Sequence, residues 1–486
     1  MTAELTSELF GTPAHALSTA IEAREVSCVE VVTAHLDRIE SLDTVYHAMS
    51  SVRPRDEALR EARERDAQLA RGERLGWMHG LPHAVKDLSD VRGLPTTSGF
   101  VKSGSAPIAA EDSLFVARLR DAGAVFVGKT NTPEFGLGSH TYNSLGPPTR
   151  NAVDPMFSAG GSSGGAAVAV ALGMVPVADG SDFMGSLRNP PGWNHVLGLR
   201  PTIGRVPDLS DDLFSAAAGV DGPIARDSRD LALLLATMAG GDDRVPLSLT
   251  DDPRLLAADL HPLRPPIRVG WLADLGGYLP MEAGILAVCE DALRRWVDAD
   301  VEPTLLPTAE GYGGVDELWP AWLALRFLQV GGALAPLAGD RATWDRMKPE
   351  AQWEVEGYRR LTVDEVVQSS RVRSGLYRSF RSLFERFDVL ALPTAQTWPF
   401  PVDLEWPRRV AGVQMNSYHR WMEVTAPATM AGLPVLALPA GHGDLGLPIG
   451  LQLIGPARSE GRLLRIAAAA ERVGGLDGRP YLRQVH

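Results

Sequence analysis

Apolar and polar residues recur along this chain with two different periods. Over residues 18–70, apolar residues such as Val31, Leu36 and Ile39 return at spacings near 3.6 residues, which predicts a helical region with a charged solvent face. After Gly76 the pattern changes to short apolar runs that Gly and Pro interrupt. Such runs are typical of buried strands, and helical stretches separate them, so the sequence predicts an α/β fold.

The second half of the chain continues this alternation. Residues 240–266 are rich in Asp, Pro and Leu and are predicted to form a connection. The elements predicted beyond them are a strand in IRVGWLADL, a helix over 281–299, a mostly helical and Trp-rich segment over 312–377, strands in FDVLALPTA and GLPVLALPAG, and a final helix over 460–473. No internal repeat divides the chain.

Composition and charge restrict the class of protein. Of the 486 residues, 45% are hydrophobic and 22% are charged, which is typical of a globular protein with a large core. The net charge of −13 disfavours nucleic acid and anionic membranes as partners and leaves small molecules. Cys28 and Cys289 lack the spacing of a metal site and are expected to be buried thiols. The first residues lack a signal-peptide pattern, which predicts a cytoplasmic protein.

One motif matches a nucleotide-binding pattern but has the wrong surroundings. The run GAVFVGKT, from Gly123 to Thr130, fits the phosphate-binding P-loop. A P-loop follows a strand and precedes a helix. Here a helical stretch precedes Gly123, the AVFV between the glycines is strand-like, and Pro133 follows soon after. We therefore predict no nucleotide at this position.

Serines and glycines are concentrated over residues 158–190. Ser162 and Ser163 both fit the G-x-S-x-G pattern of serine hydrolases, and Ser186 lies in a tight turn after the predicted strand VPVADGSD. The helix predicted over 164–172 directs its first amides toward the first two serines. Strand ends are the usual ligand sites of open α/β sheets. The residues by themselves leave three serines as candidate nucleophiles.

A serine nucleophile needs a base, and the sequence offers two kinds. The available histidines are His83, His140, His195, His419 and His442. Nothing in their positions directs one of them toward a serine. Lys86 lies in an apolar, strand-like run, where burial favours the neutral amine that can accept a proton. The alternative for Lys86 is an ion pair with Asp87 or with another carboxylate.

Four motifs carry a family resemblance. They are HGLPHAVKDLSDVRGLPTTSG, GGSSGG, GSDFMGSLRNP and GLPIGLQLIGP. In this order and spacing, from about Thr6 to the C-terminal helix, they resemble the amidase signature family of serine hydrolases. GAVFVGKTNTPEF is also common in that family. The resemblance implies an amidase signature fold, with a mixed central β-sheet flanked by many α-helices on both faces, and it implies no metal or other cofactor.

The resemblance also implies a function for each serine and for Lys86. By matching motifs, Ser186 is the nucleophile and Ser162, held in the family by a cis peptide bond, is the bridging residue. Their separation of 24 residues is the one expected for the family. Lys86 is the base, and Ser163 is a supporting hydrogen-bonding residue. In this relay, neutral Lys86 takes a proton from Ser162, which takes one from Ser186 during attack on the carbonyl carbon.

The turn around Ser186 carries the remaining implied functions. The backbone N–H groups implied as oxyanion donors are those of Phe183, Met184, Gly185 and Ser186. Asp182 and Arg188 are expected to brace the turn. Most family members have D-x-G-G-S-I-R, so Met184 replaces a glycine. If that glycine needed a positive φ, methionine would be strained. We expect a backbone conformation that methionine tolerates, and the alternative is a reshaped oxyanion hole.

The resemblance predicts one amidase signature domain over residues 1–486. Residues 60–210 are expected to form the catalytic core, and residues 311–378 a variable helical segment that lines the substrate pocket. The predicted activity is hydrolysis of a small-molecule carboxamide with an aryl or bulky apolar group through an acyl-enzyme on Ser186. Esters and carbamates allow the same chemistry. A homodimer is compatible with this prediction.

Two other functions stay open. The chain can be an amidotransferase-type subunit that delivers ammonia to a partner enzyme acting on aminoacyl-tRNA, although neither the partner nor the typical D-x-G-G-S turn is evident. It can also be a catalytically silent binding protein, for which Met184 is the only indication in the sequence.

Overall fold

The largest sheet of the molecule has eight strands. The structure is a computed structural model that describes residues 9–102, 104–210, 212–214, 218–261, 267–296 and 301–472. In spatial order the strands are β4 (Val177–Asp182), β6 (Val220–Ala225), β5 (Leu197–Arg200), β12 (Val435–His442), β13 (Pro448–Ile454), β9 (Val389–Pro393), β7 (Val269–Trp271) and β8 (Val301–Pro303). Neighbours from β4 to β9 are antiparallel, whereas β7 is parallel to both β9 and β8. The sheet is mixed, as predicted.

A second sheet of three strands carries Lys86. Its order is β1 (Met49–Val52), β3 (Val125–Thr130) and β2 (Pro82–Lys86). Strand β3 is antiparallel to β1 and parallel to β2, and β2 also contacts β4 of the large sheet. Lys86 is therefore the last residue of a strand outside the large sheet, although the sequence predicted one central sheet.

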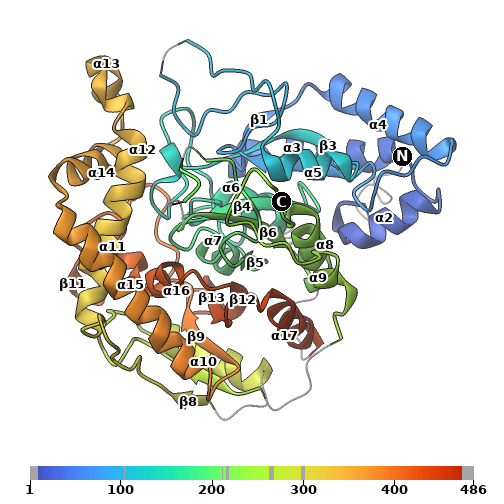
Figure 1. Ribbon diagram of the computed structural model, residues 1–486. Helices are drawn as coiled ribbons and strands as arrows, with labels where there is room; N and C mark the ends of the chain where they lie inside the picture. The colour runs from blue at the N-terminus through green and yellow to red at the C-terminus, as the bar shows by residue number, and fades with distance from the viewer. Residues whose placement is uncertain are drawn as a thin grey trace.

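Helices cover both faces of the large sheet. Helix α7 (Asn189–Trp193) packs on β12 and β13 from one side, and α10 (Ile285–Trp296) packs on the same strands from the other (Figure 1). The remaining α-helices are α2 (Ala14–Glu22), α3 (Cys28–Tyr46), α4 (Arg55–Ala70), α5 (Leu114–Asp121), α6 (Gly164–Ala171), α8 (Ser228–Met238), α9 (Leu255–Ala258), α11 (Leu318–Arg326), α12 (Gly332–Leu334), α13 (Arg341–Trp344), α14 (Pro349–Arg360), α15 (Val363–Leu383), α16 (Ala426–Ala431) and α17 (Glu460–Arg472).

The N-terminal helical prediction is correct except for one strand. Helix α3 begins at a capping box in which Ser27 and Glu30 bond each other's backbone N–H groups, and α4 carries the charged face. Between them lies β1, which the helical pattern did not predict. A four-residue segment has little local preference, and its pairing with β3 decides its conformation.

Other predictions made from patterns are confirmed. The P-loop-like run forms β3, which is buried throughout, and the segment over 312–377 is mostly helical. Two predicted helices, over 281–299 and 460–473, end beyond the described residues, which stop at 296 and 472 there. Both cysteines are buried and free. None of the described helices is long and apolar enough to cross a membrane.

Candidate active site

Three segments distant in sequence bring Lys86 and the serines together. Lys86 ends β2, Ser162 and Ser163 directly precede α6, and Ser186 lies in the turn after β4. Helix α6 has the sequence GGAAVAVA and is entirely buried, so its small residues let the serines approach both sheets. The site is enclosed, because Lys86, Ser162 and Ser186 are 1%, 3% and 7% exposed.

The side chains form a continuous series of hydrogen bonds. Lys86 Nζ lies 2.8 Å from Ser162 Oγ and 2.8 Å from Ser163 Oγ. Ser162 Oγ lies 3.0 Å from Ser186 Oγ, and the Ser162 backbone N–H donates to the same oxygen at 2.9 Å. The Gly161–Ser162 peptide bond is cis. A proton can therefore pass between Ser186 and Lys86 through one intervening hydroxyl.

Lys86 forms no ion pair with any of the described residues. Asp87, the neighbour that the sequence offered as its partner, instead pairs with Lys129, whose Nζ is 3.3 Å from its Oδ1. Burial lowers the pKa of Lys86 to about 7, although Asp221, Asp179 and Asp182 at longer range raise it. The ion pair with Asp87 is therefore not formed, and a large fraction of Lys86 is neutral near pH 7.

The histidines of the described chain do not occupy the position of a base. Among the described hydrogen bonds, none joins a histidine to Ser162, Ser163 or Ser186. His83 Nε2 lies 3.0 Å from Asp179 Oδ1. The His140 ring bonds the Val402 carbonyl and Ser158, and His195 stacks on His442. His419 faces the same pocket as Ser186 without bonding it.

Asp182 and Arg188 hold the turn that carries Ser186. The Asp182 carboxylate accepts the backbone N–H groups of Gly185 and Leu187 at 3.0 Å each. Arg188 donates to the same carboxylate through Nε and Nη2, both at 2.9 Å, and Arg200 adds a third guanidinium contact. Burial opposes ionisation, yet Arg188 and Arg200 hold the pKa of the Asp182 carboxyl well below its usual range. Charge-assisted bonds of this kind are strong, so they restrict the conformation of the turn.

The turn tolerates Met184 and gives Gly185 a different function from the predicted one. The positive φ, +93°, belongs to Gly185, and Met184 is not among the residues with positive φ. A Cβ at Gly185 would lie 2.9 Å from Thr425 Cγ2, so glycine is needed here. The Gly185 N–H donates to Asp182 and is not available as an oxyanion donor. In the described part of the chain, no protein acceptor takes the N–H of Met184 or Ser186.

A pocket with about 310 Å³ of space opens onto Ser186. Phe183 and Met184 line it from the turn, and Arg326, His419 and Met422 line it from the C-terminal half. Of the three candidate serines, only Ser186 reaches this space. The nucleophile implied by the family resemblance is thus the serine that a substrate can contact.

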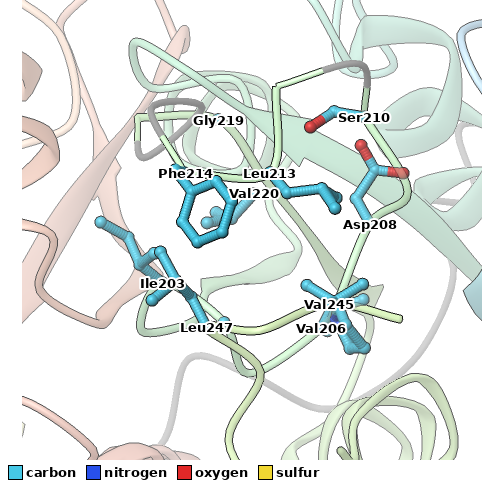
Figure 2. Close-up of a pocket in the computed structure, with 12 residues that line it drawn as sticks. Ile203, Val206, Asp208, Ser210, Leu213, Phe214, Gly219, Val220, Val245 and Leu247 are labelled. Carbon is cyan, nitrogen blue, oxygen red and sulfur yellow. The ribbon is translucent and has the colours of Figure 1, made fainter. Parts of the chain in front are cut away.

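A larger hollow lies next to β6 and is separate from the serines. It has about 530 Å³ of space and a mostly apolar lining that includes Phe214, with Asp208 and Ser210 together at one side (Figure 2). Neither Lys86 nor any of the three candidate serines lines it. We therefore place the chemistry in the smaller pocket.

One group of described side chains has ligand atoms close enough for a metal ion. His15, Asp227 and Asp230 place one ligand atom each within 4.8 Å of one another. Asp230 accepts the backbone N–H groups of Ala14 and His15, at 2.6 and 2.8 Å, and bonds the His15 ring. These bonds join α2 to α8, and none of the three residues lines the pocket at Ser186.

Known proteins that are similar to this chain identify its family. The family model named Amidase matches residues 30–464. The chain belongs to the amidase signature family. The solved structure of a bacterial aryl acylamidase of this family superposes on it with a TM-score of 0.85 at 27% identity, covering 95% of this chain and 96% of the other.

Relatives of this amidase-family chain include both an acylamidase and amidotransferase subunits. The acylamidase of Rhodococcus erythropolis is 34% identical over 473 residues, covering 94% of each chain. A glutamyl-tRNA(Gln) amidotransferase subunit of Acidothermus cellulolyticus is 36% identical over 495 residues, covering 96% of this chain and 95% of its own. Membership of this family favours amide hydrolysis. The two sequence identities are too similar to distinguish an acylamidase from an amidotransferase subunit.

Several residues of the site were not assigned to it individually from the sequence, although Arg326 lies in the segment expected to line the pocket and His419 was one of the available histidines. Ser181 lies 2.9 Å from Lys86 Nζ through its Oγ, and Asp179 accepts the Lys86 backbone N–H at 3.1 Å. Asp179 and Ser181 are two residues apart in β4, so their side chains lie on the same face of the strand. This spacing was the signal that the sequence offered. Arg326 and His419 line the pocket. No local pattern marks these two, because their segments meet Ser186 only in the folded chain.

Proposed function

We propose that this chain is a free-standing amidase that hydrolyses small carboxamides through an acyl-enzyme on Ser186. The observation that carries the proposal is the bonded series from Lys86 through Ser162 to Ser186, which ends in a pocket. Neutral Lys86 takes the Ser162 proton, Ser162 takes the Ser186 proton, and Ser186 Oγ attacks the carbonyl carbon. The reverse transfer protonates the leaving amine, and water then hydrolyses the acyl-enzyme.

The oxyanion hole of this proposal uses the backbone N–H groups of Phe183, Met184 and Ser186. The tetrahedral intermediate places its negative oxygen beside the nucleophile, where fixed N–H donors stabilise it. Gly185 contributes the turn conformation and the bond to Asp182. Asp182 and Arg188 keep the donors in place, and Ser163 holds Lys86 against Ser162.

We further propose that residues 60–210 carry the chemistry and that residues 311–378 shape the substrate pocket within one domain. Arg326, from the second segment, lines the pocket together with Phe183 from the first. Trp322 packs against Phe183 with ring centroids 5.6 Å apart. This aromatic wall supports an aryl or bulky apolar substrate group. The acylamidase and aryl acylamidase among the relatives support the same substrate class.

The second candidate is an amidotransferase subunit, which the 36% identity to the Acidothermus cellulolyticus protein favours. The substrates that the chain hydrolyses distinguish the free-standing amidase from the amidotransferase subunit. We expect the purified chain to release arylamine from acetanilide-type substrates at about 1 s⁻¹ or faster, in the range common for enzymes. The measurement is arylamine formation compared with ammonia release from glutamine. Glutamine hydrolysis without any anilide hydrolysis contradicts the proposal and favours the amidotransferase function.

The pH dependence tests the proposed base. Because burial lowers the pKa of Lys86 to about 7, the neutral amine dominates above this pH and the ammonium below it. We expect kcat/KM for an uncharged anilide to fall about tenfold per pH unit well below pH 7 and to level off above it. Initial rates between pH 5.5 and 9 give the apparent pKa. A rate constant that is unchanged across this range contradicts Lys86 as the base.

A further inference from the structure

One side chain that lines the same pocket as Ser186 has unbonded polar atoms. His419 lines the pocket and is 2% exposed. Both of its ring nitrogens are buried, and neither has a hydrogen-bond partner among the residues that the structure describes. Buried polar atoms are almost always hydrogen-bonded, and leaving one without a partner destabilises the fold. Two such atoms on one ring beside a nucleophile therefore indicate binding of a ligand.

The surroundings of His419 keep its ring uncharged. Burial first, and then the nearby cations Arg326 and Arg420, hold the pKa of His419 well below its usual range. A neutral imidazole has one N–H donor and one nitrogen acceptor. In this neutral form His419 can donate one hydrogen bond and accept another.

Aromatic rings surround the His419 ring. The centroid of the His419 ring lies 5.0 Å from that of Trp319, 5.6 Å from that of Trp353 and 4.6 Å from that of Tyr418. These distances are those of packed aromatic pairs. These three rings fix the position of the His419 ring and do not themselves line the pocket. The apolar lining that a substrate ring meets beside His419 comes from Phe183, Met184 and Met422.

The charge of the neighbouring Arg326 is compensated. Its Nε donates to Glu354 Oε1 at 2.5 Å, and its Nη2 donates to the Tyr418 hydroxyl at 2.6 Å. The Tyr418 hydroxyl donates to the same carboxylate oxygen at 2.5 Å. This ion pair leaves no net charge to attract an anion, and the guanidinium disfavours an ammonium group. The pocket suits an uncharged substrate.

We propose that His419 is a specificity-determining residue that hydrogen-bonds an uncharged polar substituent, such as a hydroxyl or carbonyl group, on the aromatic part of a neutral carboxamide. The proposal rests on the proposed amidase function and narrows its substrate class. His419 takes no part in the proton relay. It selects the substrate because its nitrogens are bonded only when a substituent of this kind is bound.

The first test compares His419→Phe with the wild type on acetanilide and its three ring-hydroxylated derivatives. Each variant-to-wild-type ratio of kcat/KM cancels the intrinsic reactivity of the substrate. We expect the ratio to fall about tenfold or more for at least one hydroxylated anilide, as for a buried hydrogen bond lost from a substrate. For acetanilide it should stay within about threefold. His261→Phe, at an exposed position, is the control. An equal loss on all four substrates contradicts the inference.

The second test needs no turnover. Phenylalanine keeps the aromatic packing and removes two unbonded polar atoms, so His419→Phe is expected to raise the melting temperature of the substrate-free protein by about 1–2 °C. A lower melting temperature would mean that His419 is structural and would overturn the inference. Absence of anilide hydrolysis by the wild type contradicts the proposed function instead, and the melting temperature still tests His419.

Discussion

Replacing Ser186 by alanine is expected to reduce anilide hydrolysis by about 10⁴-fold or more, because neither Ser162 nor Ser163 reaches the pocket to replace it. The variant should fold, since Ser186 Oγ accepts two bonds from Ser162 and its loss leaves only these donors to rearrange. Steady-state kinetics measure the loss. Labelling of the wild type with a fluorophosphonate, followed by mass spectrometry of the peptides, should place the label on Ser186.

Ser374→Ala provides the matched control for this variant. Ser374 is exposed on α15 and bonds the Ser370 carbonyl, so its replacement should leave kcat and KM unchanged. Activity of Ser186→Ala within about tenfold of the wild type, or a label on Ser162 or Ser163, would show that another serine attacks the substrate. Ser162 and Ser163 would then be the alternatives, because both bond Lys86.

Replacing Lys86 by methionine is expected to reduce kcat by about 10²- to 10⁴-fold, the usual contribution of a general base. Methionine has a similar length and no amine, so the packing of β2 is kept while the proton acceptor is lost. The rate that remains should lose its dependence on pH around 7, because the titrating group is absent. Kinetics between pH 5.5 and 9 measure both effects, and circular dichroism checks the fold.

The control for Lys86→Met is Lys102→Met, at an exposed position, which should leave the pH profile of the wild type intact. Activity of Lys86→Met close to that of the wild type would mean that the base lies elsewhere. Among the described hydrogen bonds, no histidine contacts a serine of the site. A histidine could therefore act as the base only after a conformational change that brings it to one of these serines.

Much of the fold was predictable because it depends on local pattern. Periodicity correctly predicted the apolar runs that form β2, β3, β4, β9 and β12 and the helices of the segment over 312–377. Strand β1 was missed because four residues between two helices carry no pattern of their own. The separate three-stranded sheet was missed for a related reason: strand pairing depends on contacts between distant segments.

The candidate active site was likewise predictable only in part from the sequence. The sequence motifs nominated Ser162, Ser163, Ser186 and Lys86, and they left two interpretations of Lys86 open. The folded chain excludes the ion pair with Asp87, because Asp87 bonds Lys129 and leaves Lys86 with three serine hydroxyls. The function of Lys86 as the base stays a proposal. It also changed the expected oxyanion hole, since the Gly185 N–H is bonded to Asp182.

The sequence by itself determined the family and the α/β class and nominated the candidate reactive side chains, since these follow from motifs of residues close together along the chain. The tertiary structure decided which serine lines the pocket, that Lys86 is buried, and that Arg326 and His419 line the same pocket as Ser186. Hydrogen bonding and desolvation depend on contacts between segments far apart in the sequence. Arg188 bonds Gln452, 264 residues away, and Ser186 shares its pocket with His419, 233 residues away. No spacing within a motif fixes those contacts, and only packing of the two halves of the chain does.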